Sequence, residues 1–336
     1  MTSFDHIFIS GATGYIALHI ISQLLSSGRT VIGSVRSIEK GEYLVKLFDN
    51  SKFSYVVVPI LEKEGAFDEA LKANLEVTIF LHTASPLQPI LNSEHPEQEI
   101  LIPAIDGTKY VLKSIKEHAP QIKRVVYTSS IAACATPDQL ADPTYKSGES
   151  TWTDISYELG KSNSYLAYVV SKTFAEREAW DFVKSESPNF TLSSINPTFA
   201  FGPQIDPSKT KDLNFSAQIV GNVLNFKNNE PIPTFIGAMI DVRDIAKAHI
   251  LAFEKDEAQG KRFVLNEGLF TNQTLVDIIR KEFPQLYDVL PVGVPYDYDS
   301  IIVGAYDDHN ARSILKINYI SIEESVNDTI RQILEN

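Results

Sequence analysis

Short apolar runs alternate with helical patterns through the first 196 residues of the chain. The runs are rich in Val, Ile and Phe and nearly continuous, which is typical of strands buried on both faces of a sheet. They lie at 6–10, 30–35, 53–58, 77–82, 124–129 and 191–196. Helical patterns occupy 14–27, 37–48, 64–73, 97–118 and 163–185. Repeated strand–helix–strand units predict right-handed crossovers, and therefore an α/β fold with a doubly wound parallel sheet.

The sequence changes in character after Asn196. Prolines interrupt the stretch from 197 to 240, where they favour turns because proline fixes φ and removes a backbone donor. Further elements are expected as helices at 212–227, 244–255, 273–283 and 320–334, and as a strand at 262–266. We expect a smaller, mostly C-terminal lobe that packs over the carboxyl edge of the sheet.

Composition excludes several classes of partner. The 336 residues carry a net charge of −13, whereas nucleic acids and anionic membrane surfaces bind basic faces. The one cysteine, Cys134, rules out an internal disulfide or a cysteine-based metal cluster, and we expect it to be a small buried side chain. No apolar run approaches about 18 residues, and the first residues lack the pattern of a secretory signal. These features predict a cytoplasmic protein with no metal site.

A glycine-containing turn, SGATGYIA (10–17), joins the first predicted strand to the first predicted helix. Gly11 allows a tight turn, Gly14 leaves room for a pyrophosphate, and the small Ala17 lets helix and strand pack. Free N–H groups at the helix start would bind the phosphates. A plain strand–turn–helix glycine pair would look similar, but the position favours a dinucleotide site in a Rossmann-type sheet. The turn residues expected at the cofactor are Gly11, Thr13, Gly14, Tyr15 and Ile16.

The end of the second predicted strand indicates which dinucleotide binds. NAD-preferring sites usually have an acidic residue here, whereas this chain has Arg36, with Lys40 four residues on. Residues at this spacing share a helix face, and a guanidinium suits a phosphate. We therefore predict NADPH. The alternative is that both residues are ordinary surface charges.

Two tyrosines of the 14 have a lysine four residues later, namely Tyr157 with Lys161 and Tyr168 with Lys172. About one such pair is expected by chance, so spacing alone decides nothing. Gly160 interrupts the first pair, and the polar residues that follow indicate a loop. The second pair begins a long helical run, which places both side chains on one face. We favour the second pair.

A tyrosine beside a lysine suits carbonyl reduction, which needs a hydride at carbon and a proton at oxygen. A free phenol has a pKa of about 10, and a nearby ammonium lowers it toward a useful range. The end of the fifth strand supplies hydroxyls at the carboxyl edge, where ligands bind in such sheets. We select Ser130 to hold the carbonyl oxygen, because it lies just past the strand. Ser129 would instead line the cofactor or cap the turn.

Six segments resemble, in this order, the extended short-chain dehydrogenases/reductases: SGATGYIA, LHTASP, YTSSIAA, YVVSK, INPTFAFGPQ and MIDVRDIAKAHI. Within that family the chain is most similar to the fungal NADPH-dependent methylglyoxal and isovaleraldehyde reductases, relatives of plant dihydroflavonol 4-reductase. The resemblance covers nearly the whole chain. It implies that Ser130, Tyr168 and Lys172 are the catalytic triad.

The resemblance also implies where the cofactor lies. Arg36 and Lys40 would hold its 2′-phosphate, Ala84 and Ser85 would lie beside it after the fourth strand, and Pro197 and Phe199 would lie near the nicotinamide. Tyr168 and Lys172 would contact it as well. The implied domains are 1–196 plus about 240–265 for NADPH binding, and about 197–239 with 266–336 for the substrate.

Two residues depart from the family pattern. Ser10 stands where a threonine is usual, and Ile60 stands where relatives often have an aspartate near the adenine, so backbone groups would hold the adenine. Leu87, Ile131 and Phe199 suggest an apolar slot for a modest aldehyde or ketone, although each would also suit a protein core.

The main prediction is an NADPH-dependent carbonyl reductase that acts on a small aldehyde, α-dicarbonyl or ketone as a monomer or homodimer. A nucleotide-sugar epimerase or dehydratase of the same superfamily is the first alternative, but it would usually lack the Arg36/Lys40 pair. A non-catalytic regulator that senses NADP is the second. Such a regulator has no need of serine, tyrosine and lysine together.

Overall fold

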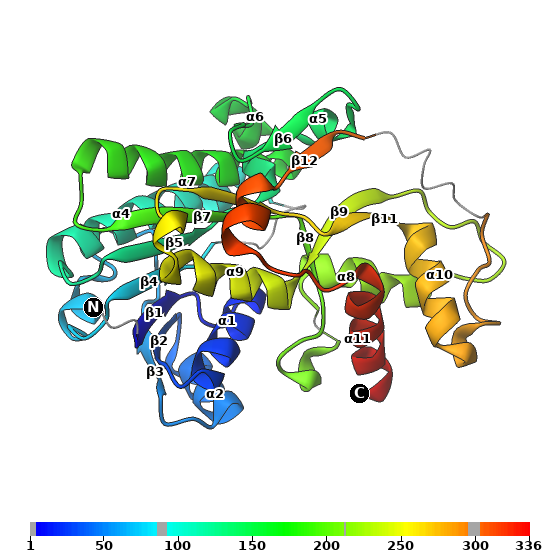
Figure 1. Cartoon of the computed structure of the whole chain (residues 1–336), viewed down its shortest axis with the longest axis horizontal. Helices are drawn as coiled ribbons and strands as arrows, with labels where there is room; N and C mark the ends of the chain where they lie inside the picture. Colours follow the sequence, from blue (N-terminus) through cyan, green and yellow to red (C-terminus); the bar gives the residue numbers. More distant parts are fainter. Residues whose placement is uncertain (1–4, 86–92, 212, 295–302) are drawn as a thin grey trace.

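The computed structural model describes residues 5–85, 93–211, 213–294 and 303–336. A large α/β lobe, mostly blue to green in Figure 1, lies beside a smaller lobe built mainly from the C-terminal third. Within the described ranges, no helix combines the length and apolar composition needed to cross a membrane.

The large lobe is built on a seven-stranded sheet in the order β10-β7-β5-β4-β1-β2-β3, with every neighbouring pair parallel. Its strands are β1 (His6–Ser10), β2 (Thr30–Val35), β3 (Phe53–Val57), β4 (Ile79–His82), β5 (Arg124–Thr128), β7 (Thr191–Pro197) and β10 (Arg262–Leu265). The doubly wound fold predicted from the sequence is confirmed. All seven predicted strands are present, and their ends differ from the prediction by at most two residues.

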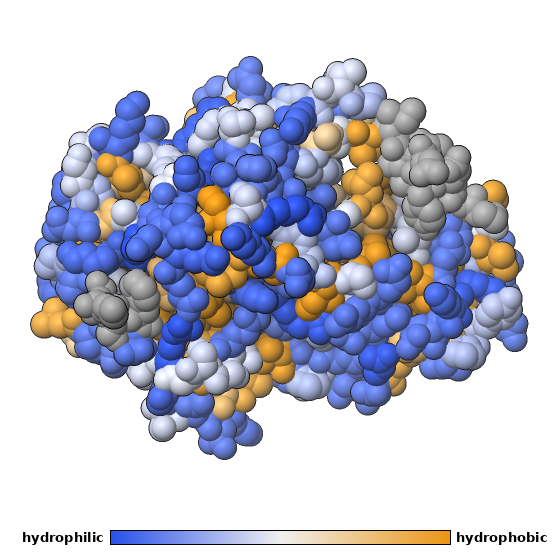
Figure 2. Space-filling view, in the orientation of Figure 1, coloured by the Kyte–Doolittle hydropathy of each residue, from blue (hydrophilic) through white to orange (hydrophobic). Residues whose placement is uncertain are grey.

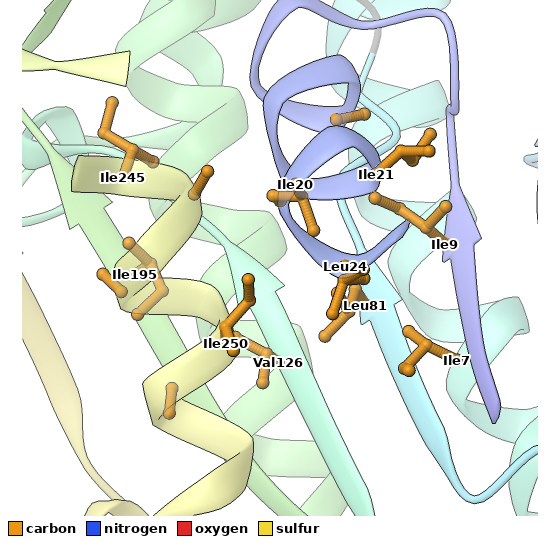
Figure 3. Close-up of a cluster of buried hydrophobic side chains, with 14 of the residues drawn as sticks. Ile7, Ile9, Ile20, Ile21, Leu24, Leu81, Val126, Ile195, Ile245 and Ile250 are labelled. Carbon is orange, nitrogen blue, oxygen red and sulfur yellow. The ribbon is translucent and has the colours of Figure 1, made fainter. Parts of the chain in front are cut away.

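Helices cover both faces of this sheet, because successive residues of a strand point to opposite sides. Ile7 and Ile9 face one helical layer, and Phe8 faces the other. The first layer contains α1 (Tyr15–Ser26), α2 (Ile38–Phe48) and α9 (Val242–Glu254). The second contains α3 (Asp68–Lys72), α4 (Ile102–His118) and α7 (Ser164–Glu186), and a π-helical turn, η1 (Glu97–Leu101), precedes α4. Figure 3 shows α1 and α9 lying side by side, with their isoleucines packed on the strands.

The smaller lobe has its own sheet and core. Strands β8 (Phe199–Phe201), β9 (Ile236–Asp241) and β11 (Gly268–Thr271) pair in the order β11-β9-β8. They pack against α8 (Phe215–Asn222), α10 (Asn272–Glu282) and α11 (Ile322–Glu335) through a separate apolar cluster that includes Phe201, Met239 and Phe270. A third sheet pairs β6 (Lys146–Gly148) with β12 (Ala305–Asp307). The sequence did not predict these five strands, because most are too short to show a periodic pattern.

The remaining elements are short. They are α5 (Pro137–Ala141), α6 (Tyr157–Ser162), and the turns η2 (Ile131–Ala133), η3 (Pro207–Lys209), η4 (Val223–Asn225), η5 (Asp256–Ala258), η6 (Pro284–Leu286) and η8 (Ala311–Leu315). The prediction that Gly160 interrupts the first tyrosine–lysine pair is wrong, because α6 is helical from Tyr157 to Ser162, and the chain leaves the helix only at Asn163. Gly160 does not break this helix. It permits close packing on α7, since a Cβ at Gly160 would lie 2.8 Å from the Cβ of Val170.

Candidate active site

The glycine turn lies where β1, β2 and β4 end. Gly11 has a φ of +69°, and a Cβ there would lie 2.8 Å from the Cα of Ala84, so only glycine fits without strain. The backbone N–H of Ala12 donates to the carbonyl of Ser34 on β2 at 3.0 Å. Gly14 is exposed and precedes α1, which leaves the first turn of the helix open to an anion. This geometry fits a bound pyrophosphate.

Ser10 forms hydrogen bonds that link the end of β4 to the glycine turn. Its Oγ lies 2.7 Å from Nδ1 of His82 and accepts from the backbone N–H groups of Thr83 at 3.1 Å and Ala84 at 3.2 Å. Burial lowers the pKa of His82 to about 3, so this imidazole is neutral and its Nδ1 can accept the serine proton. All three contacts are made by the hydroxyl group, which serine and threonine share. Serine at position 10 therefore still holds Ala84, and Ser85 after it, beside the glycine turn.

Tyr15 connects α1 to the smaller lobe. Its phenol donates to the carbonyl of Gly202 at 2.6 Å, and Nε2 of His19, one turn later, lies 2.9 Å from the carbonyl of Pro203. Thr13 and Ile16, the other predicted turn residues, are half-buried on either side of Gly14 and Tyr15.

Arg36 and Lys40 lie at the start of the second βα unit. Arg36 follows β2 directly, Lys40 is in the first turn of α2, and Ser37 caps that helix by accepting from the Lys40 backbone N–H. Both basic side chains are exposed, and neither forms a hydrogen bond or ion pair with a described residue. Two unneutralised cations near the pyrophosphate turn fit a 2′-phosphate. Ile60, after β3, is exposed and offers no carboxylate to an adenine.

The predicted catalytic side chains come together at the carboxyl edge of the sheet. Tyr168 and Lys172 lie on α7, with the lysine Nζ 6.0 Å from the centre of the tyrosine ring. The phenol lies next to the hydroxyl of Ser130, which follows β5 and caps η2 by accepting from Ala132 N–H at 3.2 Å. Burial raises the pKa of Tyr168, and the neighbouring hydroxyl of Ser130 opposes that rise.

Lys172 is almost fully buried, with 5% of its surface exposed. Burial lowers its pKa to about 8, because a charged amine loses its hydration, while the nearby carboxylate of Glu176 acts in the opposite sense. An amine with such a pKa changes its charge close to neutral pH.

The residues that were the alternatives for the catalytic roles, namely Tyr157, Lys161 and Ser129, have other neighbours. Lys161 is neutralised by Glu97 and Glu158, each at 3.4 Å, while burial and the negative charge of Glu97 raise the pKa of Tyr157. The hydroxyl of Ser129 donates to the carboxylate of Glu176 at 2.6 Å, so its proton is already used in that bond. The geometry therefore favours Ser130, Tyr168 and Lys172.

An aromatic cluster lies on the smaller lobe and begins two residues after the end of β7. Pro197 is the buried last residue of β7, and two residues later the half-buried Phe199 packs against three other phenylalanines. Its ring centre is 6.4, 6.0 and 6.2 Å from those of Phe215, Phe235 and Phe270. Apolar side chains also gather on the surface over β9 and β11 (Figure 2).

Phe215 and Phe235, which are 50% and 36% exposed, were not predicted as site residues. Phe215 begins α8 inside the helix predicted at 212–227, and Phe235 lies in the proline-rich stretch, but neither pattern indicates that both rings contact Phe199. Of the predicted substrate residues, Ile131 is half-buried at the start of η2, and Leu87 lies outside the described residues.

Residues 7–266 match the NAD dependent epimerase/dehydratase family. The chain belongs to this family. It is 45% identical to a putative NADPH-dependent methylglyoxal reductase, GRP2 of Candida albicans, over 99% of this chain and 100% of that protein. A solved reductase structure has a TM-score of 0.95 and 52% identity, covering 99% and 100% of the two chains. The structure of Gre2 from Candida albicans in complex with NADPH has a TM-score of 0.94 and 44% identity, covering 98% of each chain.

Proposed function

We propose that the protein is an NADPH-dependent carbonyl reductase that converts small aldehydes, α-dicarbonyls such as methylglyoxal, or ketones to alcohols. The observation that carries this proposal is the proximity of the Ser130 hydroxyl and the Tyr168 phenol beside the buried Lys172. It lies at the same edge of the sheet as the glycine turn. The relatives named as NADPH-dependent methylglyoxal reductases support the same reaction class.

NADPH, when bound, supplies the hydride that reduces the carbonyl carbon. The residues that would hold it are Gly11, Thr13, Gly14, Tyr15, Ile16, Arg36, Lys40, Ala84, Ser85, Pro197 and Phe199, with Tyr168 and Lys172 at its reactive end. Support for this set comes from the cradle around Gly11, the open start of α1, and the basic side chains of Arg36 and Lys40, which have no ion-pair partner among the described residues.

The chain's own residues carry the proton. The hydroxyl of Ser130 holds the carbonyl oxygen by donating a hydrogen bond, and the phenol of Tyr168 gives its proton to that oxygen as charge develops there. The ammonium of Lys172 stabilises the phenolate that remains, which lowers the pKa of the phenol. Solvent then returns the proton to Tyr168.

We propose that Ile131 and Phe199 contact the substrate, together with Leu87, which lies outside the described residues. We assign residues 1–196 and about 240–265 to the nucleotide domain, and about 197–239 with 266–336 to the substrate lobe. The second sheet and its separate core support this division. We expect the enzyme to act in the cytoplasm, where its buried Cys134 stays a free thiol.

Loss of NADPH absorbance with purified protein tests the function. The panel is methylglyoxal, isovaleraldehyde, an aryl ketone and a UDP-sugar, each repeated with NADH. We expect rapid NADPH oxidation with the small carbonyls and little with NADH or the UDP-sugar. No turnover across the panel, with NADPH still bound tightly, would favour a non-catalytic NADP sensor and overturn the proposal.

A further inference from the structure

A carboxylate is buried directly beneath the candidate catalytic side chains. Glu176 lies on α7 one turn after Lys172 and has no solvent-exposed surface. Its two oxygens accept from donors on β7, α7 and β10 and on the segment just after β5: Ser129 at 2.6 Å, Asn196 at 2.7 Å, Ser194 at 2.8 Å, Trp180 at 3.2 Å, and Arg262 at 2.7 and 3.2 Å. Burial raises the pKa of Glu176, but Arg262 and the other donors outweigh that effect, so the carboxyl is ionised.

Arg262, on β10, is the counter-ion, and its guanidinium is fully used. It donates to the backbone carbonyls of Glu149 at 3.1 Å and Thr151 at 2.5 Å, and to the sulfur of Cys134 at 3.3 Å. The indole of Trp152 covers its face at 3.9 Å. The pair is therefore held in one geometry by groups on every side.

This ion pair is joined to the catalytic side chains by two routes. Ser129 precedes Ser130 in the chain, and the amide of Asn196 donates both to Glu176 and to the backbone carbonyl of Ser130 at 3.2 Å. Lys172 shares its helix and its buried face with Glu176. The carboxylate thus connects the strand end that carries Ser130 with the helix that carries Tyr168 and Lys172.

We propose that Glu176 and Arg262 are positioning residues for the reduction, which fix Ser130 against α7 and set the charge beside Lys172. This inference rests on the proposed function. Displacement of a catalytic group by about 1 Å can cost about 100-fold in rate, so a rigid link between these two elements matters for turnover.

The charge around Lys172 has identifiable sources. Tyr168 and Glu176 share α7 with it, His82 lies on β4, Tyr127 lies on β5, and Arg262 stands behind Glu176. His82 is neutral because burial lowers its pKa to about 3, and burial raises the pKa of Tyr127, so neither changes charge near neutral pH. Glu176 and Arg262 act as fixed charges, and Tyr168 and Lys172 are the groups that titrate.

Two charge-removing variants distinguish this role from plain structural support. Glu176→Gln keeps the shape but leaves Arg262 unpaired, so Lys172 loses its proton more easily. We expect the alkaline decrease of kcat/KM to occur at a pH about 0.5 to 1 unit lower than in the wild type. Arg262→Gln leaves the carboxylate unpaired, so the same decrease should occur at a pH that is higher by a similar amount. Shifts in one direction for both variants, or no shift in either, would overturn the charge assignment.

Arg262→Lys tests the positioning role without a change of charge. Lysine cannot form the forked contacts, so we expect kcat to fall about ten-fold or more with the alkaline limb in place. An unchanged kcat would overturn the positioning role, even if the charge-removing variants fail to fold. Thermal melting and NADPH binding verify the fold of each variant.

A matched control is the exposed pair of Glu282 and Arg331, at 3.2 Å on the smaller lobe. Glu282→Gln removes the same kind of charge and should leave both kcat and the pH profile unchanged. Activity of the wild-type enzyme separates the proposed function from the positioning role of Glu176 and Arg262, because absence of carbonyl reduction by the wild type contradicts the proposed function. An active wild type whose Glu176 and Arg262 variants keep the same kcat and pH profile contradicts only the positioning role.

Discussion

Two tyrosine–lysine pairs with the same four-residue spacing lie in very different surroundings. Lys161 is neutralised on the surface by Glu97 and Glu158, whereas Lys172 is buried beside Tyr168 and within reach of one buried carboxylate. Both pairs are helical, so secondary structure does not separate them. The environment of a titratable pair, rather than its spacing, decides whether it can do chemistry.

The largest expected effect comes from removing the phenol hydroxyl of Tyr168, compared with the same change at Tyr157. Tyr168→Phe should lower kcat for methylglyoxal by about 1,000-fold, because a general acid contributes roughly 100- to 10,000-fold. NADPH binding, measured by fluorescence titration, should remain. Tyr157→Phe is the matched control and should keep kcat within about two-fold. Equal losses in the two variants would mean that the comparison is wrong.

A second test asks whether an exposed cation can be functional when no described residue forms an ion pair with it. Arg36→Ala should raise KM for NADPH by about 10- to 100-fold, because hydrogen bonds to a charged group contribute roughly 1.5–3 kcal/mol. KM for NADH should stay nearly constant. Lys46→Ala, on the last turn of α2, which begins two residues after Arg36, should change neither constant. An equal loss with both nucleotides would place Arg36 away from the 2′-phosphate.

A third test uses pH. Lys172 is charged below its pKa of about 8, and the proposed mechanism needs the charged form, so kcat/KM for reduction should be level at lower pH and fall as pH rises above about 8. Lys161→Met should leave this limb in place. A flat profile to pH 10, or a limb that disappears with Lys161, would show that Lys172 does not control the reaction.

The smallest effect concerns the aromatic cluster on the smaller lobe. Phe215→Ala and Phe235→Ala should each raise KM for an aryl ketone roughly three- to ten-fold, because an aromatic pair contributes about 0.5–1.5 kcal/mol beyond its buried area. KM for methylglyoxal, which has no ring, should change little. Tyr287→Ala removes another exposed aromatic of this lobe and is the control. Parallel changes with both substrates would mean that the cluster does not contact the ring.

Local patterns predicted most of the large lobe. Its strands are apolar runs, its helices are long, and the glycine turn lies between the two, so short segments carry enough information. The strands of the smaller lobe were harder to predict from the sequence. Strands such as Phe199–Phe201 contain only a few residues and are stabilised by partners distant in the chain. Gly160 shows the same limit, since its role depends on contact with Val170 rather than on its neighbours in sequence.

The sequence by itself determined the sheet, the dinucleotide turn and a short list of catalytic candidates, since each rests on residues close together in the chain. Tertiary structure alone decided which tyrosine meets Ser130, which lysine is buried, and that Glu176 and Arg262, 86 residues apart, form one ion pair behind them. The physical reason is that burial and charge pairing, which set the pKa of a side chain, arise from contacts between distant segments.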